Sequence, residues 1–160
     1  MGMTDETMIV STTVDAPADT VFAVLADPAT HPAIDGTGWV RESLDGQQLH
    51  ESGQLFRMAM YHANHPDGDY QVANLVRVFE PVRSIAWEPC QEGADGELDH
   101  GGWIWRYDLN PAASDQTQVT LTYDWSAVPR ETREYIQFPP FDVSHLENSL
   151  SHLASLATTR

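Results

Sequence analysis

The stretch GGWIWRYDL, residues 101–109, places Trp103, Trp105 and Tyr107 on alternate positions. Side chains two residues apart in a β-strand point to the same face of the sheet. The stretch therefore predicts a strand with three large aromatic side chains on one face. Such a row of rings can pack into a core or line the wall of a cavity.

The segments on either side of this stretch also look like strands, and helical periodicity is absent from about residue 40 to residue 126. Turn-forming sequences such as NHPDGD, EGADGE and NPAASD separate the segments. Consecutive strands joined by short turns predict an antiparallel meander of six strands. The predicted strands are Val40–Leu44, Gln48–His62, Tyr70–Glu80, Ser84–Pro89, Gly102–Leu109 and Gln118–Ser126.

The chain before the meander predicts one strand and two short helices. Met8–Val14 is apolar and rich in β-branched residues, which favours a strand. Pro17 suits the first turn of a helix, and Asp27-Pro28 ends it. ATHPAIDGTG, residues 29–38, predicts a short second helix that ends at its glycines.

The chain after the meander predicts one long helix over Asp142–Thr158, because apolar residues recur there at three- and four-residue steps. This helix would be about 25 Å long, and a nine-residue strand about 30 Å. The helix can therefore lie along the sheet and cover one face of it. With no repeats and no linker, residues 1–160 are expected to form one α+β domain.

Polar residues that alternate with apolar ones identify the inward face of each strand. Arg57, Glu88 and Arg106 mark the outer face, and Arg77 opposite Val76 and Val78 places Asn74 inside. One helix with modest side chains would leave a gap under a curved sheet, lined by rings and methionine thioethers. Each residue alone could be core, whereas the set favours a cavity. The inward set is Met58, Met60, Trp87, Trp103, Trp105, Tyr107, Tyr123 and Trp125.

The composition is strongly acidic. The chain has 24 acidic residues against 8 basic ones, all arginine, and a formal net charge of −16. This charge repels phosphate backbones and anionic lipid headgroups, so nucleic acid and membrane surfaces are not expected partners. A GC-rich genome and adaptation to high salt both fit the absence of lysine.

The expected compartment is the cytoplasm. No apolar run approaches the roughly 18 residues that cross a bilayer, and the start MGMTDETM has no signal-peptide character. Cys90 is the one cysteine, so no internal disulfide is expected.

This order of elements resembles the helix-grip fold of the START and birch-pollen-allergen (SRPBCC) superfamily, and within it the bacterial polyketide cyclase/dehydrase branch. The resemblance runs from about Met8 to Ala157 and implies a deep apolar cavity between the sheet and the last helix. Members of the superfamily include ligand carriers, aromatase/cyclases and regulators of partner proteins, so the activity depends on individual residues. The matching segments are VDAPADTVFAVLADPATHP (14–32), VRVFEPVRSIAWEP (76–89), GGWIWRYDLNP (101–111) and VTLTYDWS (119–126).

His31 and Asp35 are the candidate catalytic residues. Four residues apart on a helix, they would share one face, and the carboxylate would raise the basicity of the imidazole. Such a pair can perform general acid–base chemistry at a cavity mouth. Alternatively, Asp35 only stabilises the turn before Gly36 and Gly38, and Pro32 disturbs the helix.

Three further polar residues are candidate ligand contacts. Asn74 lies at an inward position, where a buried amide bonds either to neighbouring side chains or to a ligand. His145 and Ser149 lie beside the apolar seam of the last helix, where they could reach the cavity or remain a solvated flank.

Other reactive side chains are weaker candidates for a functional site. His62 and His65 with Asp67 and Asp69 share one hairpin, but their spacing matches no recognised metal site, so no metal is predicted. Cys90 has no obvious base beside it, and no G-x-S-x-G motif occurs. The chain has no phosphate loop or dinucleotide motif, so no cofactor is predicted.

Three functions remain open. The first is binding of a small hydrophobic, aromatic or polyketide- or lipid-like ligand in the cavity. The second is a cyclase/aromatase or dehydratase that uses the His/Asp pair, with Asn74 or Tyr123 steadying an enolate. The third is a protein-interaction module with a vestigial cavity. The expected partner is the small ligand, with a homodimer as an open alternative.

Overall fold

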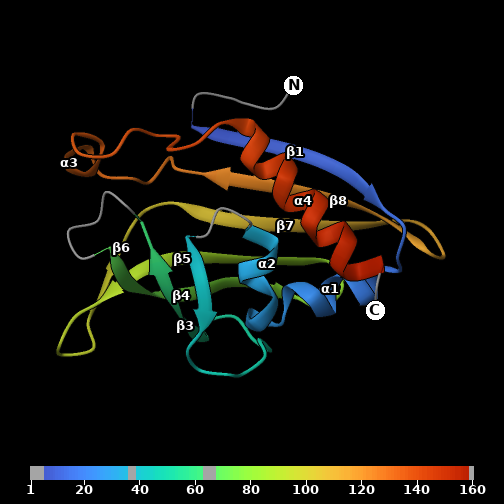
Figure 1. Cartoon of the computed structure of the whole chain (residues 1–160), viewed down its shortest axis with the longest axis horizontal. Helices are drawn as coiled ribbons and strands as arrows, with labels where there is room; N and C mark the ends of the chain where they lie inside the picture. Colours follow the sequence, from blue (N-terminus) through green and yellow to red (C-terminus); the bar gives the residue numbers. More distant parts are fainter. Residues whose placement is uncertain (1–5, 36–38, 63–67, 159–160) are drawn as a thin grey trace.

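The computed structural model describes residues 6–35, 39–62 and 68–158. Its order of elements confirms the predicted α+β arrangement, from the first strand to the long final helix (Figure 1). The strands are β1 (Thr7–Val14), β2 (Val40–Ser43), β3 (Leu55–Tyr61), β4 (Asp69–Glu80), β5 (Ser84–Glu92), β6 (Leu98–His100), β7 (Ile104–Ala113) and β8 (Gln116–Asp124). The helices are α1 (Ala18–Leu25), the 3-10 helix η1 (Pro28–Thr30), α2 (His31–Asp35), α3 (Arg130–Arg133) and α4 (Val143–Thr158).

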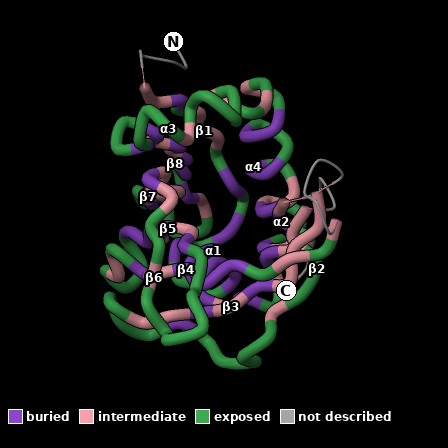
Figure 2. Tube along the Cα trace, turned by 90° about the vertical axis from the view of Figure 1, so that its left-hand side faces the viewer, coloured by how far each residue is buried: buried purple, intermediate pink, exposed green. Residues whose placement is uncertain are grey.

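The strands form one antiparallel sheet in the order β1-β8-β7-β5-β4-β3-β2, with β6 paired to β5. Helix α4 packs on β1 and against α1 and α2, so these three helices cover one face of the sheet (Figure 1). Figure 2 shows the buried stretches gathered on the inside of this arrangement. The buried apolar face of α4 consists of Leu146, Leu150, Leu153 and Ala157, as its periodicity predicts. No helix in the described part of the chain is both long and apolar enough to span a bilayer.

Trp105 lies in the middle of a row of rings that crosses the centre of the sheet. Trp87 of β5 pairs with Trp105 of β7, and Trp105 pairs with Tyr123 of β8. Residues directly opposite each other on neighbouring antiparallel strands point to the same face. The ring centroids of Trp105 and Tyr123 are 4.5 Å apart. The alternation in sequence therefore continues as a continuous aromatic surface across three strands.

The inward face of β4 differs from the prediction after Val76. The register with β5 shifts between Val76 and Val78, so an extra residue, Arg77, reverses the alternation. Phe79 therefore takes the inward position predicted for Val78, and its ring lies 5.3 Å from that of Phe22.

Several strand boundaries and two short elements also differ. Strand β3 begins at Leu55 instead of Gln48, and β5 continues to Glu92. Strand β6 forms beside residues predicted only as a turn, and helix α3 precedes the long helix. Alternation alone does not distinguish these short segments from the loops around them.

Candidate functional site

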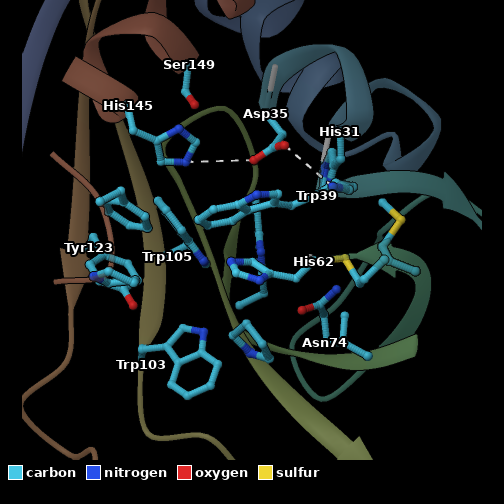
Figure 3. A pocket seen from close by; sticks show the side chains of 18 of the residues that line it. His31, Asp35, Trp39, His62, Asn74, Trp103, Trp105, Tyr123, His145 and Ser149 are labelled. Carbon is cyan, nitrogen blue, oxygen red and sulfur yellow. Dashed lines mark hydrogen bonds and ion pairs between the residues drawn. The ribbon is translucent and has the colours of Figure 1, made fainter. Parts of the chain in front are cut away.

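A cavity of about 720 Å³ lies between the inward face of the sheet and helices α2 and α4 (Figure 3). Strands β3, β4, β5, β7 and β8 form the sheet side of the wall. Pockets for drug-sized molecules measure about 300–1,000 Å³. The cavity is therefore large enough for a molecule of several fused or linked rings.

Twelve of the thirteen predicted site residues line this cavity. They come from strands far apart in sequence and from both helices (Figure 3). These residues are His31, Asp35, Met58, Met60, Asn74, Trp87, Trp103, Trp105, Tyr107, Tyr123, His145 and Ser149.

Trp125 is the exception, because the structure does not place it on the cavity wall. Strand β8 ends at Asp124, so the alternation that put Trp125 beside Tyr123 stops one residue earlier. The backbone N–H of Trp125 donates to the carbonyl oxygen of Glu6 at 3.0 Å, and the Trp125 side chain is buried in the core. Trp125 is therefore a core residue beside the site.

Sequence reasoning missed part of the wall. The connection between α3 and α4, residues 135–141, covers one side of the cavity, and Tyr135 is 86% exposed, so the cavity reaches the surface there. The composition of this connection, YIQFPPF, was the available signal, because an exposed apolar segment often borders a ligand-binding groove. The missed lining residues are Ile34, Trp39, Val40, His62, Tyr70, Pro89, Gln91, Tyr135, Ile136, Gln137, Phe138, Pro140 and Phe141.

Phe141 connects the sheet to α4 through ring contacts. Its ring centroid lies 4.9 Å from Tyr123, 5.6 Å from Trp105 and 4.6 Å from His145. Trp39 adds another ring, 6.2 Å from His145. These rings form one aromatic end of the cavity, next to the first turns of α4.

His31 is a buried, neutral imidazole. Its Nε2 lies 2.8 Å from the carbonyl oxygen of Leu25, which can only accept, so Nε2 carries the proton. The ring stacks on Trp87, with centroids 4.8 Å apart. Burial lowers the pKa of His31 to about 4, although the Leu25 hydrogen bond opposes this shift. At neutral pH, the His31 side chain is therefore an uncharged ring in the cavity wall.

Asp35 lies beside a different imidazole from the predicted one. Its Oδ1 lies 3.7 Å from Nε2 of His145 (Figure 3). Helix α2 has only five residues, and His31 at its start bonds back to the end of α1. Asp35 therefore faces α4. Burial lowers the pKa of His145, and the nearby Asp35 carboxylate partly offsets this effect.

Three polar groups on the wall make no hydrogen bond with the described residues. They are the side-chain amide of Asn74 and the hydroxyls of Tyr107 and Tyr123. Burial raises the pKa of both tyrosines, so their hydroxyls keep their protons. Buried polar groups are normally hydrogen-bonded to protein, water or a ligand. The wall therefore offers donors and an acceptor to the contents of the cavity.

The described part of the wall carries an acidic side chain but no arginine. Among the described residues that line the cavity, Asp35 is the one carboxylate, and no arginine is present.

Comparison with protein families finds no matching family model. The uncharacterized protein Rv0088 of Mycobacterium tuberculosis is 29% identical over 117 residues, which cover 73% of this chain and 46% of that protein. The chain thus spans about half the length of the curated relatives it matches.

Solved structures share the fold over nearly the whole chain. The Zhui aromatase/cyclase of Streptomyces superposes with a TM-score of 0.64 at 20% identity, covering 96% of this chain and 94% of that one. Norcoclaurine synthase of Thalictrum flavum, solved with dopamine and hydroxybenzaldehyde, gives 0.60 at 14% identity, covering 97% and 87%. The chain has the helix-grip fold, as its resemblance implies.

Proposed function

We propose that this protein binds a small, mainly aromatic molecule in the cavity under α4. The observation that carries the proposal is the open cavity of about 720 Å³ whose wall is formed largely by aromatic side chains. Rings that only packed a core would fill this space. The same observation favours ligand binding over a protein-interaction module with a vestigial cavity.

The ligand carries polar groups as well as rings. The amide of Asn74 and the hydroxyls of Tyr107 and Tyr123 face the cavity without partners among the described residues. A ligand with hydroxyl or carbonyl groups would satisfy them, whereas a pure hydrocarbon would leave them unpaired at a cost of about 1–3 kcal/mol each. A hydroxylated or carbonyl-bearing aromatic molecule, of polyketide type, fits this wall.

The ligand is neutral or cationic. An anion in the cavity would meet the Asp35 carboxylate and would find no arginine on the described part of the wall. The net charge of −16 acts in the same direction. The electron-rich faces of Trp39, Trp105 and Phe141 would attract a cation.

A matched series of probes tests this preference: naphthylmethanol, naphthylmethylamine and naphthoate share one ring system and differ in charge. We expect the anion to bind at least about tenfold more weakly than the alcohol, equivalent to about 1.4 kcal/mol. Asp35→Asn should narrow this gap, and Asp115→Asn, in the exposed β7–β8 turn, should leave it unchanged. Isothermal calorimetry provides the dissociation constants. Equal affinity for the anion and the alcohol, or no saturable binding of any probe, contradicts the proposal.

Acid–base catalysis in the same cavity is a second candidate function. The observation that favours it is the pair of Asp35 and His145, 3.7 Å apart on the wall. The two solved structures compared above are both named as enzymes. A neutral His145 could remove a proton from a bound ketone, with Asp35 stabilising the imidazolium that forms.

Hydrogen–deuterium exchange of a bound aromatic ketone tests the catalytic candidate. If His145 acts as a base, the protein accelerates exchange at the carbon beside the carbonyl, and His145→Gln removes the acceleration while the ketone still binds. Exchange at the rate seen in buffer would leave binding as the function.

A further inference from the structure

A second cluster of reactive side chains lies on the opposite face of the sheet from the cavity. On β5, Trp87 and Pro89 line the cavity. Glu88 and Cys90 alternate with them and therefore point to the other face. His100 of the short strand β6 lies directly across from Cys90 in the register. The hairpin of β5 and β6 thus brings a carboxylate, a thiol and an imidazole together.

The distances in this cluster suit a metal ion. Nδ1 of His100 lies 3.5 Å from Sγ of Cys90 and 3.0 Å from Oε1 of Glu88. All three donor atoms lie within 4.8 Å of one another. In a tetrahedral zinc site the nitrogen–sulfur and nitrogen–oxygen separations are about 3.6 Å and about 3.3 Å. The two distances from the His100 nitrogen are therefore close to those of a zinc site.

The surroundings of the cluster support such a site. Glu88 and Cys90 are buried, whereas half of the His100 side chain is exposed, which gives an ion a path from solvent. Nη1 of Arg77 lies 2.7 Å from Oε1 of Glu88 and orients the carboxylate. Residues that orient a ligand in this way commonly surround metal sites. The acidic surface also raises the local concentration of cations.

We propose that Glu88, Cys90 and His100 bind a divalent transition metal ion of the zinc type, with water in the fourth position. Thiolate and imidazole ligands favour Zn²⁺ over Mg²⁺ or Ca²⁺. Binding releases the proton of the Cys90 thiol to solvent as the sulfur–metal bond forms. The ion therefore competes with a proton for the sulfur, and its affinity increases with pH.

The same contacts could instead form only a hydrogen-bond network around the buried Glu88 carboxylate, and cobalt spectroscopy distinguishes the two. Co²⁺ is added to the reduced, metal-free protein in the presence of excess Mg²⁺, which saturates the acidic surface. We expect a thiolate-to-cobalt charge-transfer band in the near ultraviolet that saturates at one equivalent and disappears when Zn²⁺ is added.

Variants assign the ligands. Cys90→Ser should abolish the charge-transfer band. His100→Ala should weaken Co²⁺ binding by about tenfold or more, because loss of even a residue that only orients a metal ligand lowers the affinity this much. His50→Ala removes an exposed histidine, paired with Glu51, and should change nothing. Binding of naphthylmethanol should remain normal in all three variants, since the cavity lies on the other face.

Absence of the charge-transfer band in the reduced protein, or a titration unchanged by His100→Ala, would overturn the proposal and leave the hydrogen-bond network. Because the His100 side chain is half exposed, its removal should not unfold the protein. The Co²⁺ titration of His100→Ala therefore tests the proposed metal site even if Cys90→Ser fails to fold.

Discussion

Trp105→Ala should weaken binding of naphthylmethanol by about ten- to a hundredfold, equivalent to about 1.4–2.8 kcal/mol. Trp105 lies in the middle of the aromatic wall, paired with Trp87 on one side and Tyr123 on the other. Its ring also stacks on Phe141, with centroids 5.6 Å apart at 29°. Large aromatic side chains at the centre of a binding site contribute most to affinity.

Calorimetry is the suitable measurement, because removing a tryptophan changes the protein fluorescence. Ile9→Ala is the matched control, since Ile9 is a large apolar residue on β1 that is 37% exposed and does not line the cavity. A cooperative thermal transition in both variants shows that they are folded. If Trp105→Ala bound the probe as tightly as the unmodified protein, the ring would not be part of the binding wall.

Acid should destabilise this protein through His31, by up to about 3 kcal/mol. Burial lowers the pKa of His31 from 6.5 to about 4 in the folded state, so the unfolded chain binds its proton first as the pH falls. The stabilisation is fully present above pH 6.5 and is lost as the pH falls toward 4. The size follows from about 1.4 kcal/mol for each pKa unit of difference.

Urea unfolding between neutral pH and about pH 4.5 measures this loss, and His31→Gln provides the comparison. Glutamine cannot titrate, and its amide can still donate toward the Leu25 carbonyl. His145 also has a lowered pKa and contributes in the same direction in both proteins, so the difference between the two pH profiles isolates His31. Parallel profiles would show that His31 is protonated as easily in the folded state as in the unfolded chain.

The strands could be predicted because one face of the sheet is apolar and the other polar. Trp103, Trp105 and Tyr107 alternate with Arg106 and Asp108. This alternation involves only residues adjacent in sequence, so it can be recognised without the tertiary structure. The bulge at Arg77 could not be predicted, because one inserted residue changes the register without changing the composition of the strand. Trp125 was assigned to the cavity because alternation does not show where a strand ends.

The partners across the site could not be predicted, because they depend on tertiary packing. His145 lies 110 residues after Asp35, and only the approach of α4 to α2 makes them a pair. His100 and Cys90 are ten residues apart. The segment between them resembles a loop, so the strand β6 that aligns them was not predicted. The resemblance to helix-grip proteins located the cavity but did not identify these pairs.

The most direct test of ligand binding in the cavity under α4 uses the methionine methyl groups as reporters in carbon-13 NMR. Met58 and Met60 line the cavity, whereas Met8 is buried in β1 and does not line it. Binding of naphthylmethanol should shift the methyl signals of Met58 and Met60 through the ring current of the probe, with the dissociation constant found by calorimetry, and should shift Met8 least. Saturable binding that leaves the Met58 and Met60 signals in place would mean that the molecule binds outside this cavity, contrary to the account.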